Sequence, residues 1–249
     1  NAGNEIYGYT AIDSMGGKLR IFGGEVNVET SGDDVAVALG VFVDEDENVS
    51  GSVMTMTDGV LNLNNSDFCC AVDLFPGSEM NLQGGVINAE NANFMLGGDV
   101  LLDGTRINAI NSFIHVDNNF VMDSGEINML EGYNCIEFNG MVEMNGGSIN
   151  LSMADVYVNN GFQFNGGEIN IENLEEIQHA WSALAVNTYF AISGDAQLNI
   201  VHALKEPAIR INGTFHQMGG NFLPLIQMVL HTMDLLIGFM ALSCKYNYI

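Results

Sequence analysis

The sequence predicts an all-β protein that folds as a single-stranded parallel β-helix, and three observations support this prediction. A short phrase, glycine-x-aliphatic-asparagine-aliphatic, recurs eight times with minor variation along the 249 residues. Apolar residues alternate with polar ones beside each copy, as in strands that bury one face. The chain also has 29 glycines and only 3 prolines, which suits many tight turns between short strands.

The copies of the phrase follow one another at intervals close to 20 residues. Measured from asparagine to asparagine, the intervals are 35, 26, 20, 20, 22, 20 and 29 residues. A unit of about 20 residues with insertions near both ends of the array explains these intervals. The repeat residues to which we assign a structural role are Gly24, Asn27, Gly59, Asn62, Gly85, Asn88, Asn108, Gly125, Asn128, Gly147, Asn150, Gly167, Asn170 and Asn199.

Each unit contains three short strands, as the pairs Val156/Val158, Phe162/Phe164 and Ile169/Ile171 illustrate. Such strands cannot bury their apolar faces alone, but units stacked on one another can. Eight turns spaced about 4.8 Å apart would form a rod. A propeller needs a repeat about twice as long, and leucine-rich repeats need a different phrase.

Glycine and asparagine have structural roles in this interpretation. The glycine before the third strand should have a positive φ angle and let the chain turn a corner. The asparagine should form a stacked ladder of side-chain amides or a simpler outward polar row. A regular outward row of this kind could also meet sugar hydroxyls.

The repeat divides the chain into three parts. Residues 1–18 lack the phrase and are expected to form an N-terminal cap or first turn, and residues 19–222 the β-helix. Residues 223–249 form an apolar tail, for which a capping helix, a truncated or aberrant end and a marginal membrane anchor stay open. His231 and Asp234 near its centre disfavour the anchor. No membrane span is expected in the β-helix.

Charge excludes some partners. The 31 acidic and 6 basic residues give a formal net charge of −25, which argues against nucleic-acid binding through phosphate contacts. Consecutive acidic residues near the N-terminus include Asp44, Asp46 and Glu47, whose carboxylates could bind Ca²⁺. The alternative is a solvated acidic loop, and no other cofactor is indicated.

No catalytic residue is assigned, because the five histidines share no register with serine or cysteine. Aromatic residues predict a glycan-binding role, since sugars pack on amphipathic rings. Tyr157 lies between two inward valines and should face solvent. Tyr133, Trp181 and Tyr189 are the other candidate glycan-binding residues.

The repeated phrases, clearest over Cys135–Leu151, Asp155–Ile171 and Leu184–Ile200, resemble those of secreted carbohydrate-binding domains of clostridia and other gut or plant-degrading bacteria. The resemblance covers about residues 19–222. It implies a right-handed, pectate-lyase-like β-helix and binding of acidic plant polysaccharides, in some members with calcium. It also implies an extracellular location, secreted or on the cell surface. Arg210-Ile211-Asn212 departs from the polygalacturonase signature Arg-Ile-Lys, which argues against hydrolase activity.

The leading hypothesis is a non-catalytic extracellular module that binds a polysaccharide or a host or cell-surface glycan, or that adheres to a surface. We expect it to be a monomer or part of a larger surface protein. The alternative is a polysaccharide lyase or glycoside hydrolase on the same scaffold, because the fold alone does not separate the two. Three carboxylates converging beside an arginine would favour the enzyme, and an evenly polar or aromatic face would favour binding.

Overall fold

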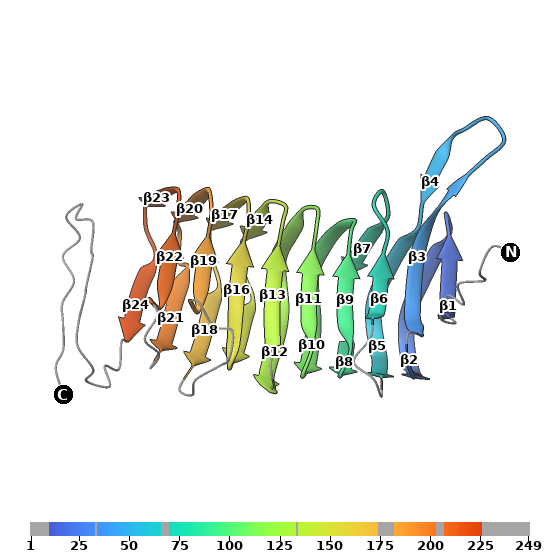
Figure 1. Ribbon diagram of the computed structural model, residues 1–249, viewed down its shortest axis with the longest axis horizontal. Coiled ribbons are helices and arrows are strands. Elements are labelled where there is room, and N and C mark those ends of the chain that lie inside the picture. The colour runs from blue at the N-terminus through green and yellow to red at the C-terminus, as the bar shows by residue number, and fades with distance from the viewer. Residues whose placement is uncertain are drawn as a thin grey trace, which may run out of the picture.

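The computed structural model describes residues 10–32, 34–65, 70–132, 134–173, 182–202 and 207–225. Within these ranges every regular element is a β-strand, and every strand pair is parallel except β3 with β4. The strands form an elongated stack with successive parts of the chain side by side (Figure 1). The all-β, parallel β-solenoid architecture is therefore confirmed.

One sheet has ten strands among the described residues. Nine of them pair in parallel, one after another. The tenth, β4 (Val49–Gly51), pairs antiparallel with the C-terminal residues of β3. In spatial order the nine are β1 (Thr10–Met15), β3 (Val35–Val43), β6 (Cys70–Leu74), β9 (Asn93–Leu96), β11 (Phe113–Val116), β13 (Asn134–Phe138), β16 (Ala154–Val158), β19 (Leu184–Val186) and β22 (Ile209–Ile211).

The other sheet has fourteen strands among the described residues and divides into two branches. Four long strands pass through both branches: β2 (Lys18–Thr30), β5 (Val53–Asn65), β10 (Asp99–Ile110) and β12 (Phe120–Glu131). The first branch also contains β7 (Glu79–Leu82), β14 (Val142–Met144), β17 (Gly161–Phe164), β20 (Tyr189–Ile192) and β23 (Thr214–Gln217). The second branch also contains β8 (Val86–Glu90), β15 (Ser148–Ser152), β18 (Glu168–Asn173), β21 (Gln197–His202) and β24 (Asn221–Leu225).

Equivalent repeat residues are stacked in register. Ile127 of β12 pairs with Ile149 of β15, which in turn pairs with Ile169 of β18. All three side chains are buried. The prediction that the aliphatic residues of the repeat form a column is therefore confirmed.

The interior of the coil is a continuous column of apolar side chains. Phe162, Phe164 and Phe190 are buried, and the ring of Phe162 lies 5.7 Å from that of Phe164 and 5.2 Å from that of Phe190. Each fully buried side chain of this size contributes about 1.5–3 kcal/mol. Since every turn contacts only its neighbours, stability accumulates along the stack.

Glycine lets the chain turn between the two branches. At Gly147 φ is +81°, and a Cβ atom there would lie 2.7 Å from the carbonyl oxygen of Gly125, closer than real contacts allow. The predicted positive φ is confirmed at the repeat glycines, which are Gly24, Gly59, Gly85, Gly125, Gly147 and Gly167.

The ends of the stack extend the predicted β-helix in both directions. β1 pairs in parallel with β3, so residues 10–15 are part of the sheet, and β24 continues the other sheet to Leu225. Residues 226–249 of the apolar tail lie outside the described residues. None of the described residues forms a helix with the length and hydrophobicity needed to cross a membrane.

The pair β3–β4 is a hairpin that projects beyond the parallel stack (Figure 1). Asp44 holds its turn, because its Oδ1 accepts hydrogen bonds from the backbone N–H groups of Asp46 and Asn48, both at 2.9 Å. Phe42, Val43 and Val49 of this hairpin are exposed.

The core column predicts a large cost for removing one of its rings. Phe164→Ala should lower the free energy of unfolding by about 3–5 kcal/mol, because the stacked neighbours cannot collapse into the cavity. Phe22→Ala is the matched control, since Phe22 is 65% exposed, and should change it by less than about 0.5 kcal/mol. Denaturant unfolding monitored by circular dichroism measures both, and equal effects would contradict the assignment of Phe164 to the core.

Candidate functional site

The outward side chains form rows along the rod, because parallel strands in register place equivalent residues beside one another. The central row of the ten-stranded sheet contains several groups that titrate or form hydrogen bonds. In order it consists of Asp73, Met95, His115, Glu137, Tyr157, Ala185 and Arg210. The second branch of the other sheet carries the asparagines of the repeat.

The repeat asparagines form an unbroken ladder of side-chain amides. In each step Nδ2 of one asparagine donates to Oδ1 of the asparagine on the preceding strand, at distances from 2.6 to 3.1 Å. The donor–acceptor pairs are Asn62–Asn27, Asn88–Asn62, Asn108–Asn88, Asn128–Asn108, Asn150–Asn128, Asn170–Asn150 and Asn199–Asn170. Of the two structural alternatives, the ladder is therefore correct.

All amides of this ladder have the same orientation. A ladder step uses one N–H of an amide and one lone pair of its oxygen, which leaves a second N–H and a second lone pair. Where no neighbouring side chain accepts from this second N–H, the ladder amide presents both a donor and an acceptor to a ligand. A hydroxylated ligand can use both.

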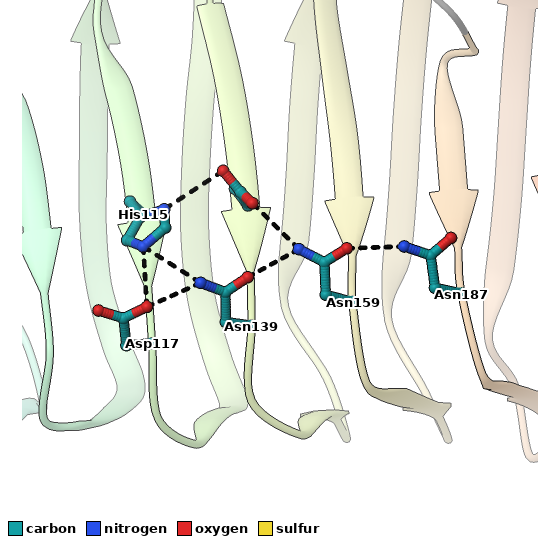
Figure 2. Close-up of polar contacts among 6 residues, drawn as sticks. His115, Asp117, Asn139, Asn159 and Asn187 are labelled. Atoms are coloured by element: carbon teal, nitrogen blue, oxygen red, sulfur yellow. Dashed lines mark hydrogen bonds and ion pairs between the residues drawn. The ribbon is translucent and has the colours of Figure 1, made fainter.

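A second amide row follows the strands of the ten-stranded sheet. Asn139 donates to Asp117, and Asn159, Asn187 and Asn212 each donate to the asparagine before them, all at 2.7 Å. Figure 2 shows the row from Asp117 to Asn187. An aspartate suits its first position, since a carboxylate only accepts hydrogen bonds. Asp123 begins a third, shorter row in the same way, accepting from Asn145 at 2.9 Å.

His115 connects the start of the second row to two carboxylates (Figure 2). Its Nε2 lies 2.9 Å from Oδ1 of Asp117, and its Nδ1 lies 3.3 Å from Oε2 of Glu137. Asn159 also donates to Glu137, at 3.0 Å. The hydrogen bond from Asn139 lowers the pKa of Asp117; partial burial opposes this effect and His115 adds to it.

Next to this cluster lies a buried carboxyl group. Asp155 of β16 is buried, and its Oδ1 has no hydrogen-bond partner among the described residues. Burial raises the pKa of Asp155 to about 6, and a hydrogen bond with Tyr157 partly offsets this rise. The neighbouring Cys135 is a free thiol, and burial with the nearby charges of Asp155 and Glu137 raises its pKa to about 12. A thiol of this kind is a poor nucleophile at neutral pH.

An open groove of about 410 Å³ runs along the N-terminal half of the asparagine ladder. Its volume is in the range of ligand sites. One wall of the groove is the ladder itself. The other wall consists of the outward side chains that lie two residues after each ladder asparagine on the same strand. Residues between the two walls, such as Leu63, form the floor. The wall residues are Asn27, Asn62, Asn88 and Asn108 on one side and Glu29, Asn64, Glu90 and Ile110 on the other.

The structure does not bring the described candidate tyrosines together. Tyr157 is half-buried in the outward row of the ten-stranded sheet, as its alternation predicted. Tyr189 belongs to the other sheet, where its ring lies 5.6 Å from that of His216. Tyr133 and Trp181 lie outside the described residues. A shared aromatic platform is therefore not formed by Tyr157 and Tyr189.

The proposed calcium ligands lie at the tip of the β3–β4 hairpin. Asp44 also accepts two hydrogen bonds from Nδ2 of Asn48, at 3.2 and 2.9 Å, so both of its oxygens hold the turn. Among the described residues, no group of three or more His, Cys, Asp or Glu side chains is arranged to hold a metal ion. Calcium binding through Asp44, Asp46 and Glu47 stays a prediction.

The carboxylates of the described face make contacts within the protein. Asp117 and Glu137 both contact His115, and Asp155 is buried beside Tyr157. Arg106 pairs with Glu126 at 2.6 Å on the other sheet. Enzyme activity stays a prediction.

Sequence reasoning left the ladder as one of two alternatives for the repeat asparagines, and it missed the second amide row and the His115 cluster. The sequence does contain a pattern that marks the second row. In each strand concerned, the residue after the last apolar one belongs to the row, and these residues are Asp117, Asn139, Asn159, Asn187 and Asn212. Aligning the repeats at that strand, rather than at the glycine phrase, would have shown the row.

Comparison with known proteins identified no relative. No protein-family model matches the chain, and no curated protein or solved structure shows significant similarity to it.

Asp117, which contacts His115, and the buried Asp155 should respond to pH in opposite directions. The pKa of Asp155 is raised in the folded protein from 3.8 to about 6, so its contribution to stability falls as pH rises through this window. Asp155→Asn should raise Tm at pH 7 by about 2–4 °C, the shift for roughly 1 kcal/mol in a protein of this size, and by less at pH 4. The pKa of Asp117 is lowered, so its charged form stabilises the fold above the ordinary aspartate pKa.

Asp117→Asn is the matched control for this experiment. It should lower Tm at pH 7, and the difference from the unchanged protein should shrink as the pH falls through the folded-state pKa. Thermal melting of both variants from about pH 2 to 8 measures the two trends, because the folded-state pKa of Asp117 lies below the ordinary aspartate value. Parallel trends would contradict the assigned environments.

Proposed function

We propose that the chain is a non-catalytic, extracellular β-solenoid that binds a polysaccharide or cell-surface glycan along its outward amide rows. The observation that carries the proposal is the asparagine ladder with the groove of about 410 Å³ beside it. The ladder places amides at one regular spacing, some of which retain a donor and an acceptor, and the groove is long and open. A linear, hydroxylated polymer fits both features.

The architecture in this proposal is that of the carbohydrate-binding β-helices that the repeats resemble. It includes a right-handed coil of about eight turns, and a secreted or cell-surface location in a bacterium. The repeats stack as parallel strands in two sheets, and this supports the β-solenoid fold that the resemblance implies. The location and the source rest on the resemblance alone.

Charge narrows the class of glycan. With a net charge of −25, the protein repels a polyanion in the absence of a bridging cation. Two classes avoid this repulsion, namely a neutral glycan and a uronate bridged by Ca²⁺. Binding of the second class would require calcium, whereas binding of the first would not.

A glycan array probed with the purified protein tests this function. We expect binding to plant or cell-surface polysaccharides, with signals for uronates appearing only when Ca²⁺ is added. Failure to bind any glycan, with or without Ca²⁺, would refute the proposal.

A degradation assay separates binding from catalysis. Incubation with each polysaccharide that binds should release no new reducing ends and no unsaturated uronates, because the proposed module binds its glycan without cleaving it. Product formation would support the lyase or hydrolase instead, provided that the activity co-purifies with the chain.

A further inference from the structure

The asparagines of the ladder differ in how much hydrogen-bonding capacity they have left. A row of outward residues lies beside the ladder, in the order Glu25, Val60, Val86, Arg106, Glu126, Ser148, Glu168 and Gln197. Where the residue on the preceding strand is a glutamate, it accepts from the ladder amide. Asn62, Asn150 and Asn199 have such contacts, to Glu25 at 3.1 Å, Glu126 at 3.4 Å and Glu168 at 2.9 Å.

Asn88 and Asn108 lack this second contact within the described part of the chain. The neighbours on the preceding strands are Val60 for Asn88 and Val86 for Asn108, which have no side-chain acceptor. Each of the two amides therefore retains an N–H and a lone pair after its ladder bonds are made. Both residues line the groove.

The opposite wall of the groove supplies acceptors and an apolar patch. Glu29, Asn64, Glu90 and Ile110 are neighbours on successive strands. The two carboxylates are thus two strand spacings apart, about 9.6 Å along the rod. Ile110 is 40% exposed and offers an apolar surface at the end of the wall. No lysine or arginine is among the described residues that line the groove.

We infer that this groove is a subsite for an uncharged, hydroxylated glycan chain that lies along the rod. Sugar hydroxyls accept from the amides of Asn88 and Asn108 and donate to the carboxylates of Glu29 and Glu90. A C–H face of the sugar packs on Ile110. Glu29 and Glu90 repel a carboxylated sugar, so the subsite selects neutral glycans. The inference rests on the proposed glycan-binding function and narrows its ligand from two classes to one.

Titration calorimetry in calcium-free buffer tests the selectivity. The probes are cellohexaose, mannohexaose and xylohexaose as neutral chains and hexagalacturonate as the charged one. At least one neutral chain should bind, and hexagalacturonate should not. Glu29→Gln/Glu90→Gln keeps hydrogen-bonding groups at the wall but removes its charge, and should allow weak binding of hexagalacturonate. Binding of hexagalacturonate to the unchanged protein would overturn the inference.

A matched pair of ladder variants tests the position of the subsite. Asn88→Ala/Asn108→Ala removes three ladder bonds, namely Asn88–Asn62, Asn108–Asn88 and Asn128–Asn108. Asn150→Ala/Asn170→Ala also removes three, namely Asn150–Asn128, Asn170–Asn150 and Asn199–Asn170, outside the groove. The first variant should bind the neutral chain at least about tenfold more weakly, because two ligand hydrogen bonds are lost. The second should stay within about twofold of the unchanged protein.

The outcomes separate the two proposals. Equal loss in both variants, or no loss in either, would overturn the subsite while glycan binding itself stands. Array binding confined to charged glycans would also overturn the subsite while glycan binding itself stands. If no glycan binds the unchanged protein under any condition, the proposed function fails and the subsite fails with it. Equal melting temperatures of the two variants would exclude unequal unfolding as the cause of a difference.

Discussion

In-register parallel stacking is the constraint on which the rest of this structure depends. Each strand pairs with the equivalent strand of the next turn, so a residue type that recurs in the sequence also recurs in space. Inward, this places Ile127, Ile149 and Ile169 in one buried column. Outward, it places Asn128, Asn150 and Asn170 in one hydrogen-bonded row. The same repeat therefore builds both the core and the surface, and a change of register by one residue would exchange them.

The amide rows solve a problem that stacking creates. Identical charged residues in one row would lie about 4.8 Å apart and repel one another, whereas identical amides attract, because each has both a donor and an acceptor. Each bond of this kind is worth only about 0.5–1.5 kcal/mol, but the rows extend over many turns. Carboxylates occur at the first position of two rows, Asp117 and Asp123, where an acceptor alone is sufficient. An acidic chain can in this way carry long polar faces without rows of like charge.

The repeat period and the residue types in the sequence predicted much of the architecture. Alternation identified the strands, and the glycine phrase identified the corners at which φ is positive. The recurrence of asparagine before the last aliphatic residue of the phrase predicted a row of amides, either a hydrogen-bonded ladder or a simpler outward row. The second amide row was not predicted, because it follows strands of the ten-stranded sheet, whereas the glycine phrase marks strands of the other sheet. Its spacing varies from 20 residues between Asn139 and Asn159 to 28 between Asn159 and Asn187, yet turns of different length still return the chain to the same column.

The sequence by itself determined that the chain is a parallel β-solenoid and which residues point inward, because periodicity of 2 within strands and of about 20 between turns is local information. Only the tertiary structure decided which outward groups meet. It brought His115, Asp117 and Glu137 together and placed Tyr157 and Tyr189 in different sheets. It also left Asn88 and Asn108 beside valines rather than glutamates. The physical reason is that, apart from the contact of His115 with Asp117, these contacts join residues on different turns, and their partners depend on the register between turns and on the lengths of the loops that set it.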